Sequence, residues 1–379
     1  MNKGLYSCGI FIALQKAFDT VDHEVLLSKL EHYGIRVISN TWFRSYLKNR
    51  RQYVCISGMK SRLRIIKHGV PQGSVLGPLL FLIYINDLPN AINTCLTLLF
   101  ADDTCLLSSE SSLERLEIKV NSALSCLSEW LRANKISLNA AKTEAILFRG
   151  VRKSVSYDIN LVLDNTKLKL SSSVKYLGIR LDQHLSWSVH LDFLATKLRT
   201  ANGVLSKLRY YIPLCTLLPI YYALFHSHLS YAAIVWGQTL NNHSRISRLQ
   251  NKAVRILTFS RYDSSAAPLY AQTGIPAIPN YIFYLNVKTI HETLNNIVPS
   301  ALQNLFHFQQ LSHQHFTRNS ELKLLERPKA KTLKYGLKSI RYQAILNWNQ
   351  LLLHSKQDLT VFSKNNLKTL VRDFFVSQN

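Results

Sequence analysis

Two adjacent carboxylates, Asp102 and Asp103, separate two short apolar runs at residues 96–100 and 104–108. A connection this short between two strand-like runs predicts a β-hairpin with both carboxylates at its tip. Hard cations such as Mg²⁺ prefer carboxylate oxygens, and a hairpin tip holds such oxygens on a rigid support. The arrangement therefore indicates a metal site, and a polar hairpin turn without chemistry is the alternative interpretation.

Further blocks accompany the hairpin in a definite order along the chain. They are residues 11–23, 69–78 with 84–88, 134–143 and 175–178. Taken with Phe100-Ala-Asp-Asp103, these blocks make nearly the whole chain resemble the reverse transcriptases of LINE-type, non-LTR retrotransposons. Several ordered blocks are far more specific than any one of them alone.

The resemblance implies an α+β fold, a right-hand polymerase palm with an antiparallel sheet and packed helices. An all-helical thumb and a C-terminal helical tail would follow it. The implied reaction copies RNA into DNA by extending a DNA 3′-hydroxyl primer with dNTPs. Nucleotidyl transfer of this kind uses two divalent metal ions roughly 3.5–4 Å apart, here expected to be Mg²⁺.

The resemblance also assigns roles to individual residues. Asp102 and Asp103 match the metal-binding carboxylates, and Phe18 matches the ring that lies under the incoming sugar and excludes a 2′-hydroxyl. Lys142 matches a lysine near the departing phosphate, where it would donate a proton or stabilise charge. Phe18 as a simple core residue and Lys142 as an ordinary exposed lysine are the alternatives.

Two short segments complete the implied nucleic-acid site. The loop Pro71-Gln72-Gly73 matches the segment that lies against the template and the incoming nucleotide, with a glycine that permits close backbone approach. The turn Tyr176-Leu177-Gly178 matches the primer grip, and ordinary strand packing of Tyr176 is the alternative.

Position 13 departs from the family pattern, because Ala13 stands where the resemblance requires the first catalytic Asp. A methyl group cannot bind a metal ion, and losing a ligand worth several kcal/mol should slow the reaction about a thousandfold or more, at about 1.4 kcal/mol per tenfold. Asp19 is not expected to substitute, because six extended residues place it roughly 20 Å farther along the chain. This copy is therefore expected to be impaired or inactive as an enzyme.

The start of the chain is a second departure. It begins only a dozen residues before Ala13, so we expect an N-terminally truncated polymerase with most of its fingers and any endonuclease domain missing. The expected divisions are a palm with partial fingers at 1–183, a helical thumb at 184–262 and a helical region of unknown role at 263–379.

The charge balance favours polyanionic partners. Lys and Arg number 46 against 22 Asp and Glu, a net charge of +24, and no acidic residue lies between Asp192 and Asp263. Within this stretch, a basic stripe is expected beside a buried stripe on one helix. It consists of Arg245, Arg248, Lys252 and Arg255. Such a stripe suits sequence-independent contact with nucleic-acid phosphates, and a solvated helix face is the alternative.

The cysteines and the apolar segments limit the cellular compartments that the protein can occupy. Six scattered cysteines without a Cys-x-x-Cys pair argue against a disulfide framework or a zinc site. The apolar run 212–236 contains two prolines and two histidines, so a buried helical hairpin suits it better than a membrane span. We expect a nuclear or cytoplasmic protein that is not secreted.

The local patterns predict most elements. Strands are expected at 9–14, 52–57, 63–67, 96–100, 104–108, 136–138, 145–148 and 174–181, and helices at 22–33, 41–47, 78–87 and 112–134. The β content should stop near Asp182, with helices following from Trp187.

Three other functions compete with the polymerase. One is a non-catalytic nucleic-acid-binding remnant or domesticated RNA-binding protein that keeps the basic stripe. Another is a remnant without a cellular role, and a basic membrane-associated protein is the third.

Overall fold

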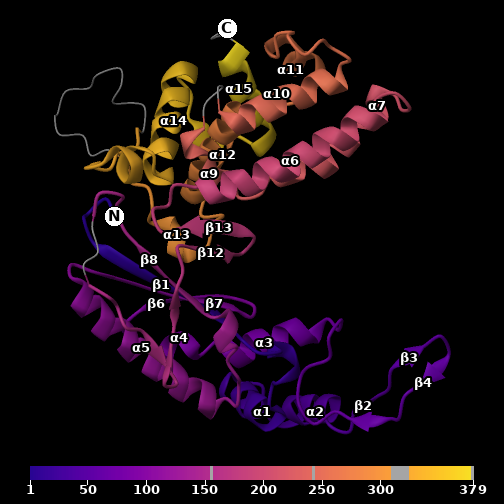
Figure 1. Ribbon diagram of the computed structural model, residues 1–379, viewed down its shortest axis with the longest axis vertical. Helices are drawn as coiled ribbons and strands as arrows, with labels where there is room; N and C mark the ends of the chain where they lie inside the picture. Colours follow the sequence, from indigo (N-terminus) through magenta and orange to yellow (C-terminus); the bar gives the residue numbers. More distant parts are fainter. Residues whose placement is uncertain (154–156, 241–243, 309–323, 377–379) are drawn as a thin grey trace. The chain divides into compact units, whose positions relative to one another are not determined.

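The computed structural model describes residues 1–153, 157–240, 244–308 and 324–376. It consists of two compact units, Lys3–Ser186 and Trp187–Asn379, shown in Figure 1. This boundary lies close to the one expected at 183/184. The division expected at 262/263 stays a prediction; one apolar cluster includes Leu198 on one side of it and Ile278 on the other.

A five-stranded sheet forms the centre of the first unit, in the order β11-β8-β1-β7-β6. Its strands are β1 (Tyr6–Ala13), β6 (Leu96–Phe100), β7 (Asp103–Glu110), β8 (Glu144–Phe148) and β11 (Lys169–Leu170). All neighbours pair antiparallel except β11 and β8, which are parallel. The predicted hairpin of β6 and β7 and the predicted strand at 145–148 are confirmed.

Helices and short hairpins cover this sheet. The helices are η1 (Ala17–Asp19), α1 (His23–His32), α2 (Val37–Leu47), α3 (Leu76–Ile85), α4 (Leu88–Ala91), α5 (Leu113–Ala133) and η2 (Ala140–Lys142). The hairpins are β9 (Val162–Leu163) with β10 (Thr166–Lys167) and β12 (Ser173–Tyr176) with β13 (Ile179–Asp182).

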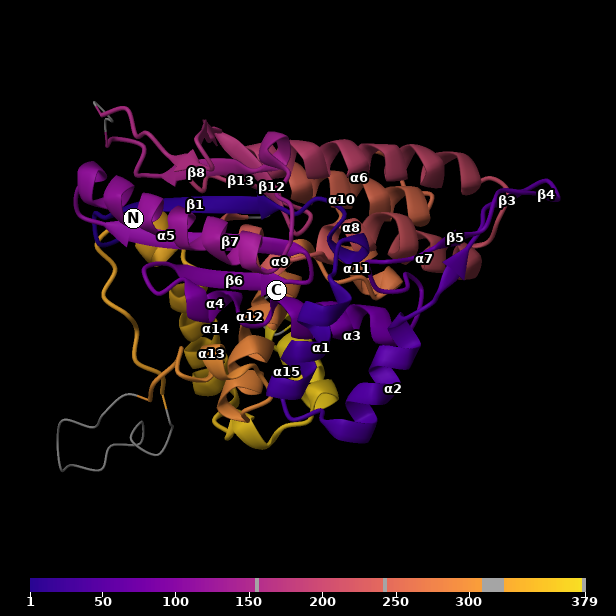
Figure 2. The ribbon, with the colours of Figure 1, turned by 90° about the horizontal axis from the view of Figure 1, so that it is seen from below.

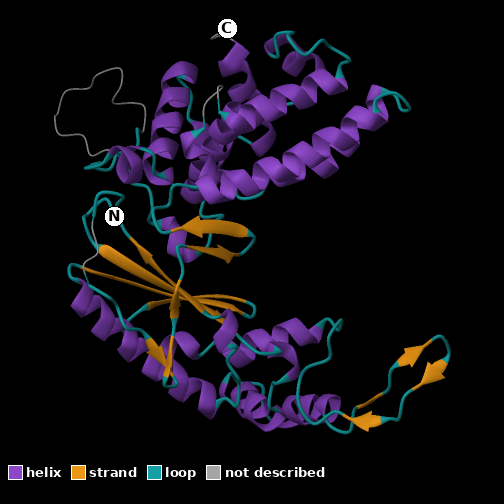
Figure 3. Ribbon diagram, in the orientation of Figure 1, coloured by secondary structure: helices purple, strands orange, loops and turns teal. Residues whose placement is uncertain are grey.

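The alternation of side chains along β1 decides what covers each face of the sheet. Cys8, Ile10 and Ile12 are buried in one apolar cluster with side chains of α1, α3 and α5. Phe11 points to the other face, where it joins a smaller cluster with Val174 of β12. Figure 3 shows the helices on one side of the sheet and the β12–β13 hairpin on the other.

Capping residues set the starts of α1 and α5, close to the starts of the predicted helices at 22–33 and 112–134. The Asp22 side chain accepts hydrogen bonds from the amides of Glu24 and Val25 at the start of α1, and Ser112 caps α5 in the same way. Gly34, at φ +90°, follows the end of α1.

The expected strand at 136–138 is wrong. Only one residue of it pairs, in an isolated bridge between Leu138 and Leu14 just beyond the end of β1. Strands β9, β10 and β11 are not among the predicted elements, because each spans only two residues and leaves no periodic pattern.

A slender arm extends from the first unit between α2 and α3 (Figures 1 and 2). It consists of β2 (Arg51–Gln52), β3 (Cys55–Ile56), β4 (Met59–Lys60) and β5 (Arg64–Ile65), with β2 paired to β5 and β3 paired to β4. Ser57 and Gly58 form its tip at φ +50° and +85°, as a two-residue hairpin turn requires. The two predicted strands around Gly58 are therefore confirmed only in part. The range 52–57 contains β3 and the end of β2, the range 63–67 contains β5, and β4 was not predicted.

The second unit is helical, as predicted. Its helices are α6 (Ser188–Leu208), α7 (Leu214–Tyr221), η3 (Tyr222–His226), α8 (Ser227–Ser230), α9 (Ala233–Trp236), η4 (Gly237–Thr239), α10 (Arg245–Leu257), α11 (Ala267–Thr273), α12 (Ile278–Leu294), α13 (Ser300–Gln303), η5 (Leu333–Leu337), α14 (Ile340–Ser355), η6 (Leu359–Val361) and α15 (Lys364–Val376). No helix in the described part of the chain combines the length and apolar character of a membrane span. Beyond Asp182 the described residues add one isolated β-bridge, between Phe308 and Leu325.

The end of α10 holds an aromatic residue in an unfavourable backbone conformation. Phe259 lies in the left-handed region at φ +56°, where a helix terminus usually has glycine. The Phe259 amide donates to the Ile256 carbonyl and the Ser260 amide to the Arg255 carbonyl. The left-handed conformation costs a residue with a side chain about 1–2 kcal/mol, and 53% of the Phe259 side chain stays exposed.

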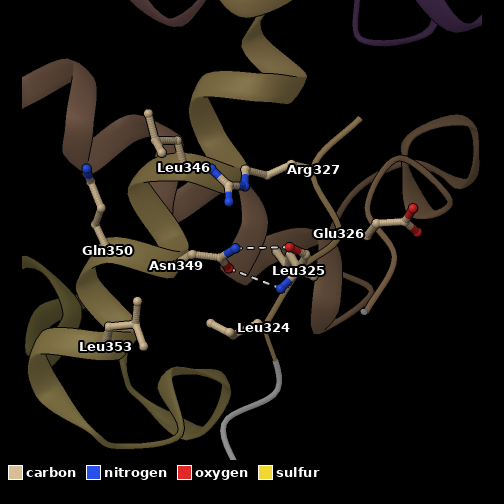
Figure 4. A pocket seen from close by; sticks show the side chains of 8 residues that line it. All are labelled: Leu324, Leu325, Glu326, Arg327, Leu346, Asn349, Gln350 and Leu353. Atoms are coloured by element: carbon tan, nitrogen blue, oxygen red, sulfur yellow. Dashed lines mark hydrogen bonds between the residues drawn. The ribbon is translucent and has the colours of Figure 1, made fainter. Parts of the chain in front are cut away.

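Asn349 on α14 fixes a distant extended segment of the second unit (Figure 4). Its side-chain amide donates to the Leu325 carbonyl at 2.9 Å, and its side-chain oxygen accepts from the Leu325 amide at 3.0 Å. Both backbone groups of one residue are thus satisfied by one side chain.

Replacing Asn349 with Ala should lower the free energy of unfolding by about 2 kcal/mol, because two partly buried backbone groups lose their partners. Gln350→Ala is the matched control, since Gln350 is the next residue of α14, lines the same small pocket as Asn349 and Leu325 (Figure 4), and is exposed. Urea unfolding followed by tryptophan fluorescence measures both. Equal stability of the two variants would contradict the structural role of Asn349.

Candidate functional site

The register of the sheet gathers the predicted chemical residues at one end. Ala13, the last residue of β1, pairs directly with Asp103, the first residue of β7. Asp103 also pairs with Phe100 across the tip of the β6–β7 hairpin. The two tip residues are Ala101, at φ +50°, and Asp102, so the predicted hairpin places the two carboxylates next to position 13.

Ala13 and Asp103 point to the same face of the sheet, because directly opposed residues of antiparallel strands share a face. Phe11 pairs with Cys105 two residues along, and the Phe11 ring lies 5.0 Å from the Tyr176 ring, centroid to centroid. The side chain of position 13 therefore lies on the face that the β12–β13 hairpin covers.

The electrostatics of Asp103 show crowding of negative charge. Burial raises the pKa of the Asp103 carboxyl, the neighbouring Asp102 raises it further, and Lys175 of β12 acts in the opposite direction. A bound cation would relieve this repulsion. Lys175 was not among the predicted site residues, and only its place directly before the Tyr176 turn could have indicated it.

The donor set fits one hard divalent cation more readily than two. Asp102 and Asp103 supply two adjacent carboxylates, but the opposed position 13 presents a methyl group. Among the described residues, no group of three or more His, Cys, Asp or Glu side chains is arranged to hold a metal ion. A site for two ions would need a further carboxylate at this end of the sheet.

The block that contains Lys142 is held against position 13 through the backbone. The Asn139 amide donates to the Ala13 carbonyl at 2.8 Å, and the Thr143 hydroxyl oxygen accepts from the Ala13 amide at 3.3 Å. Thr143 also donates to the Asn139 carbonyl at 3.0 Å. Lys142 itself is exposed in η2, so its ammonium group is free to reach a ligand at this end of the sheet.

Phe18 and the Pro71-Gln72-Gly73 loop also meet, because η1 packs against the start of that loop. The Val70 amide donates to the Phe18 carbonyl at 2.8 Å, and the Phe18 ring contacts the Phe81 ring with a centroid distance of 4.6 Å. Phe18 is only half-buried, so part of its ring faces outward.

The expected extended run from position 13 to Asp19 is wrong. The chain turns at Lys16, at φ +48°, and then forms η1. The Asp19 carboxylate accepts a hydrogen bond of 2.8 Å from the Gln72 side chain. The Gln72 side-chain amide is thus already partly engaged within the domain.

Gly69 allows the backbone at the start of the 69–78 loop to lie directly against the backbone of Asp19. It has φ +89°, and a Cβ atom there would lie 2.8 Å from the Asp19 Cα and carbonyl oxygen. Its amide donates to the Val21 carbonyl at 2.7 Å. Only glycine allows the two backbones to come this close.

Gly69→Ala should lower the free energy of unfolding by at least about 2 kcal/mol, because strain at positive φ adds to a backbone clash. Gly73→Ala is the matched control, with φ +79° but open space around its Cβ position. The control should lose only the conformational term of about 1 kcal/mol. Urea denaturation compares the two, and equal losses would contradict the close-contact argument.

The predicted primer-grip residues form the turn between β12 and β13. Tyr176 pairs with Ile179, and Leu177 and Gly178 lie between them at φ +45° and +77°. Burial raises the pKa of Tyr176, with smaller contributions from the nearby Cys105 and Asp103. The structure therefore brings this turn to the carboxylate pair.

Comparison with known proteins identifies the first unit. Residues 1–181 match the family model described as reverse transcriptase (RNA-dependent DNA polymerase). Residues 1–181 form a reverse transcriptase domain. The paired strands, the Asp-Asp hairpin and the 69–78 loop described above belong to this domain.

Three of the relatives are RNA-directed DNA polymerases of transposable elements in Drosophila melanogaster. The chain is 28% identical over 267 residues to the probable RNA-directed DNA polymerase from transposon X-element, covering 67% of this chain and 28% of that relative. It is 30% identical over 298 residues to the probable RNA-directed DNA polymerase from transposon BS, covering 73% of this chain and 32% of that relative. It is 29% identical over 314 residues to the RNA-directed DNA polymerase from mobile element jockey, covering 79% of this chain and 32% of that relative.

The chain thus spans about a third of the length of these relatives. Among solved structures, apo telomerase from Candida tropicalis aligns with a TM-score of 0.38 and 13% identity, covering 97% of this chain and 53% of that chain. This structural likeness is too weak to bear on function.

The basic stripe of α10 is only partly free. Its four cations are on the predicted helix, but Arg245 forms an ion pair with Asp192, and Arg255 donates to the Ser264 carbonyl at 2.7 Å. Arg248 and Lys252 are exposed, and they form no ion pair within the described residues. The sequence could not show the engagement of Arg245, because its partner lies more than fifty residues away.

The arm β2–β5 is a second basic surface, and none of the predicted site residues lies on it. No acidic residue lies between Glu31 and Asp87, so all charged residues there are basic. Those within the arm are Arg51, Lys60, Arg62 and Arg64. The others, Arg36, Arg44, Lys48, Arg50 and Lys67, flank it, and Arg44 and Lys48 form ion pairs with Glu24. Every residue from Arg51 to Ile65 is exposed. The absence of acidic residues was the signal that could have revealed this surface.

Proposed function

We propose that this chain is the polymerase part of a non-LTR retrotransposon protein, which copies RNA into DNA by extending a DNA 3′-hydroxyl with dNTPs. The observation that carries the proposal is the convergence at one sheet end of position 13, the Asp102–Asp103 tip and the Lys142 block. The family match covers the residues that form this end.

Asp102 and Asp103 would hold the divalent ion, for which we propose Mg²⁺, because two adjacent carboxylates suit a hard cation. When bound, such an ion stabilises the charge that develops on the reacting phosphate oxygens. Lys142 would add positive charge near the departing phosphate.

The remaining residues of the domain would position nucleic acid and nucleotide. Phe18 would lie under the incoming sugar and exclude ribose by steric conflict. The loop Pro71-Gln72-Gly73 would contact the template side, with Gln72 held by Asp19. The half-buried Tyr176 and Leu177 and the exposed Gly178 would contact the primer end beside the carboxylates.

The same geometry predicts a weak catalyst. The side chain of Ala13 shares a face with Asp103 and offers no oxygen, so the second ion would lack a ligand. A chain that keeps nucleic-acid binding without polymerisation is the second candidate, and the exposed basic arm and α10 cations favour it. Either function would place the protein in the nucleus or the cytoplasm.

Primer extension tests the proposal. The full chain and its Ala13→Asp variant are assayed on an RNA template with an annealed DNA primer, dNTPs and Mg²⁺. Metal-dependent extension by the variant would support a polymerase site. Absence of extension by both proteins, with tight binding of the same primer–template, would support the binding function instead.

A further inference from the structure

An exposed group of aromatic rings surrounds one arginine on the second unit. The guanidinium carbon of Arg209, which follows α6, lies 4.3 Å from the Phe259 ring centroid and 5.3 Å from that of Tyr210. The Tyr210 and Phe259 rings meet edge to face, with centroids 6.2 Å apart and planes at 84°. We refer to Arg209, Tyr210 and Phe259 as the ring cluster.

The ring cluster is open to solvent rather than part of the core. The exposed fractions are 72% for the Tyr210 side chain and 53% for Phe259. Tyr211, directly after Tyr210, and Tyr262, three residues after Phe259, are also exposed, at 84% and 88%. Large rings lose little water in such positions, so the hydrophobic effect does not account for them.

Stability does not account for Phe259 either. Its left-handed backbone would be relieved by glycine, and the contact of the half-buried Arg209 guanidinium with its ring at best offsets this strain. Strain that the fold does not require tends to occur at functional positions. The residue therefore points to a ligand that uses the ring.

The surrounding charge selects the class of ligand. The sequence between Asp192 and Asp263 contains no carboxylate, and Lys207, just before the ring cluster, is exposed. Arg209 forms no ion pair within the described residues, and its Nε–H is buried without a hydrogen-bond partner. The site thus combines positive charge with flat exposed rings.

We propose that the ring cluster binds unpaired bases of single-stranded nucleic acid. Bases stack on exposed aromatic rings and on guanidinium planes, while the adjacent cations contact the phosphates. A duplex keeps its bases stacked on each other, so it offers these rings nothing comparable. The inference rests on the proposed function only in that both require a nucleic-acid ligand.

The ring cluster lies at the C-terminal ends of α6 and α10. They lie alongside each other in Figure 2, and the Asn202 side chain on α6 donates to the Leu249 carbonyl on α10 at 3.0 Å. Buried side chains of both helices share one apolar cluster. The ring cluster is therefore built from the ends of two helices whose relative position is fixed.

The test measures binding rather than polymerisation, so its failure is separable from failure of the proposed function. Fluorescence anisotropy gives the affinity of the full chain for labelled oligo(U), oligo(dT) and a duplex of equal length. The variants are Tyr210→Ala with Phe259→Gly, and Phe308→Ala as a control, because Phe308 is an exposed ring elsewhere on the same unit.

The double variant should bind single strands about 10-fold more weakly, which corresponds to about 1.4 kcal/mol. Its affinity for the duplex and the salt dependence of binding should stay unchanged, because stacking involves no ion release. The ratio of oligo(U) to oligo(dT) affinity then shows whether RNA or DNA is preferred.

The single variant Phe259→Gly serves as the folding control. Glycine suits the left-handed backbone at this position, so the unfolding midpoint of the variant should equal or exceed that of the unaltered chain. Unchanged affinity for both single strands would overturn the proposal. An equal loss on single strands and duplex would also overturn it, because the ring cluster would then contact the backbone alone.

Discussion

Ala13→Asp is expected to raise metal-dependent primer extension by about a thousandfold. The reason is the register of the sheet: position 13 faces Asp103 directly, so a carboxylate there would lie within about 4.5–5.5 Å of it, Cβ to Cβ. Three carboxylates can then share the charge of two cations. A gain of this size corresponds to about 4 kcal/mol of transition-state stabilisation.

The backbone at position 13 is already held in place by neighbouring residues. The Ala13 amide and carbonyl are already bonded to Thr143 and Asn139, and its side chain is half-buried. Stability in the absence of metal should fall slightly, because a third negative charge joins Asp102 and Asp103. Added Mg²⁺ should restore it.

The matched control is Ala13→Asn, which has nearly the same volume but no charge. It should give little or no gain, because an amide oxygen is a weaker ligand than a carboxylate for a hard cation. Ala13→Asp combined with Asp102→Asn should also lose the gain. If Ala13→Asp and Ala13→Asn give equal rates, the missing carboxylate is not the main lesion.

The end of the sheet that carries Asp102 and Asp103 could be predicted from the sequence, because its elements depend on residues close together in the chain. The hairpin of residues 96–108 needs only alternating side chains and a two-residue connection, and the ends of α1 and α5 follow from Asp22 and Ser112. The pairing of Ala13 with Asp103 is not local, and only the resemblance to a family could anticipate it.

Contacts between distant residues account for what the sequence did not predict. Arg245 bonds to Asp192 and Gln72 bonds to Asp19, and no pattern of spacing signals either contact. The turn at Lys16 was also missed, because residues 14–19 contain no glycine or proline to mark it. Local periodicity predicts which face of an element is buried, but not which partner a polar group finds.

Neutralising the arm should weaken nucleic-acid binding about 100-fold at 0.15 M salt. The variant replaces Arg51, Arg62 and Arg64 with Gln, and each loss removes one counterion-releasing phosphate contact. The slope of log affinity against log salt should therefore fall by about 2.7 on a duplex. Fluorescence anisotropy across a salt series measures both quantities.

The arm offers an unusually clean site for this experiment. Every residue from Arg51 to Ile65 is exposed, so the substitutions should leave the unfolding transition unchanged. The control neutralises Lys3, Arg152 and Lys169, three exposed cations of the same unit. It lowers the net charge equally, and it should cost much less affinity if contact rather than overall charge matters.

Two outcomes would decide the role of the arm. Equal losses in the arm variant and the control would mean that net charge alone attracts nucleic acid. Unchanged affinity in the arm variant would show that the arm does not bind nucleic acid through its cations. Its role would then rest on its exposed apolar residues, among them Ile56 and Met59 at 70% and 80% exposure. A two-stranded hairpin without a core is marginal in water, so the arm needs a surface to lie on, and the salt slope shows whether that surface is nucleic acid.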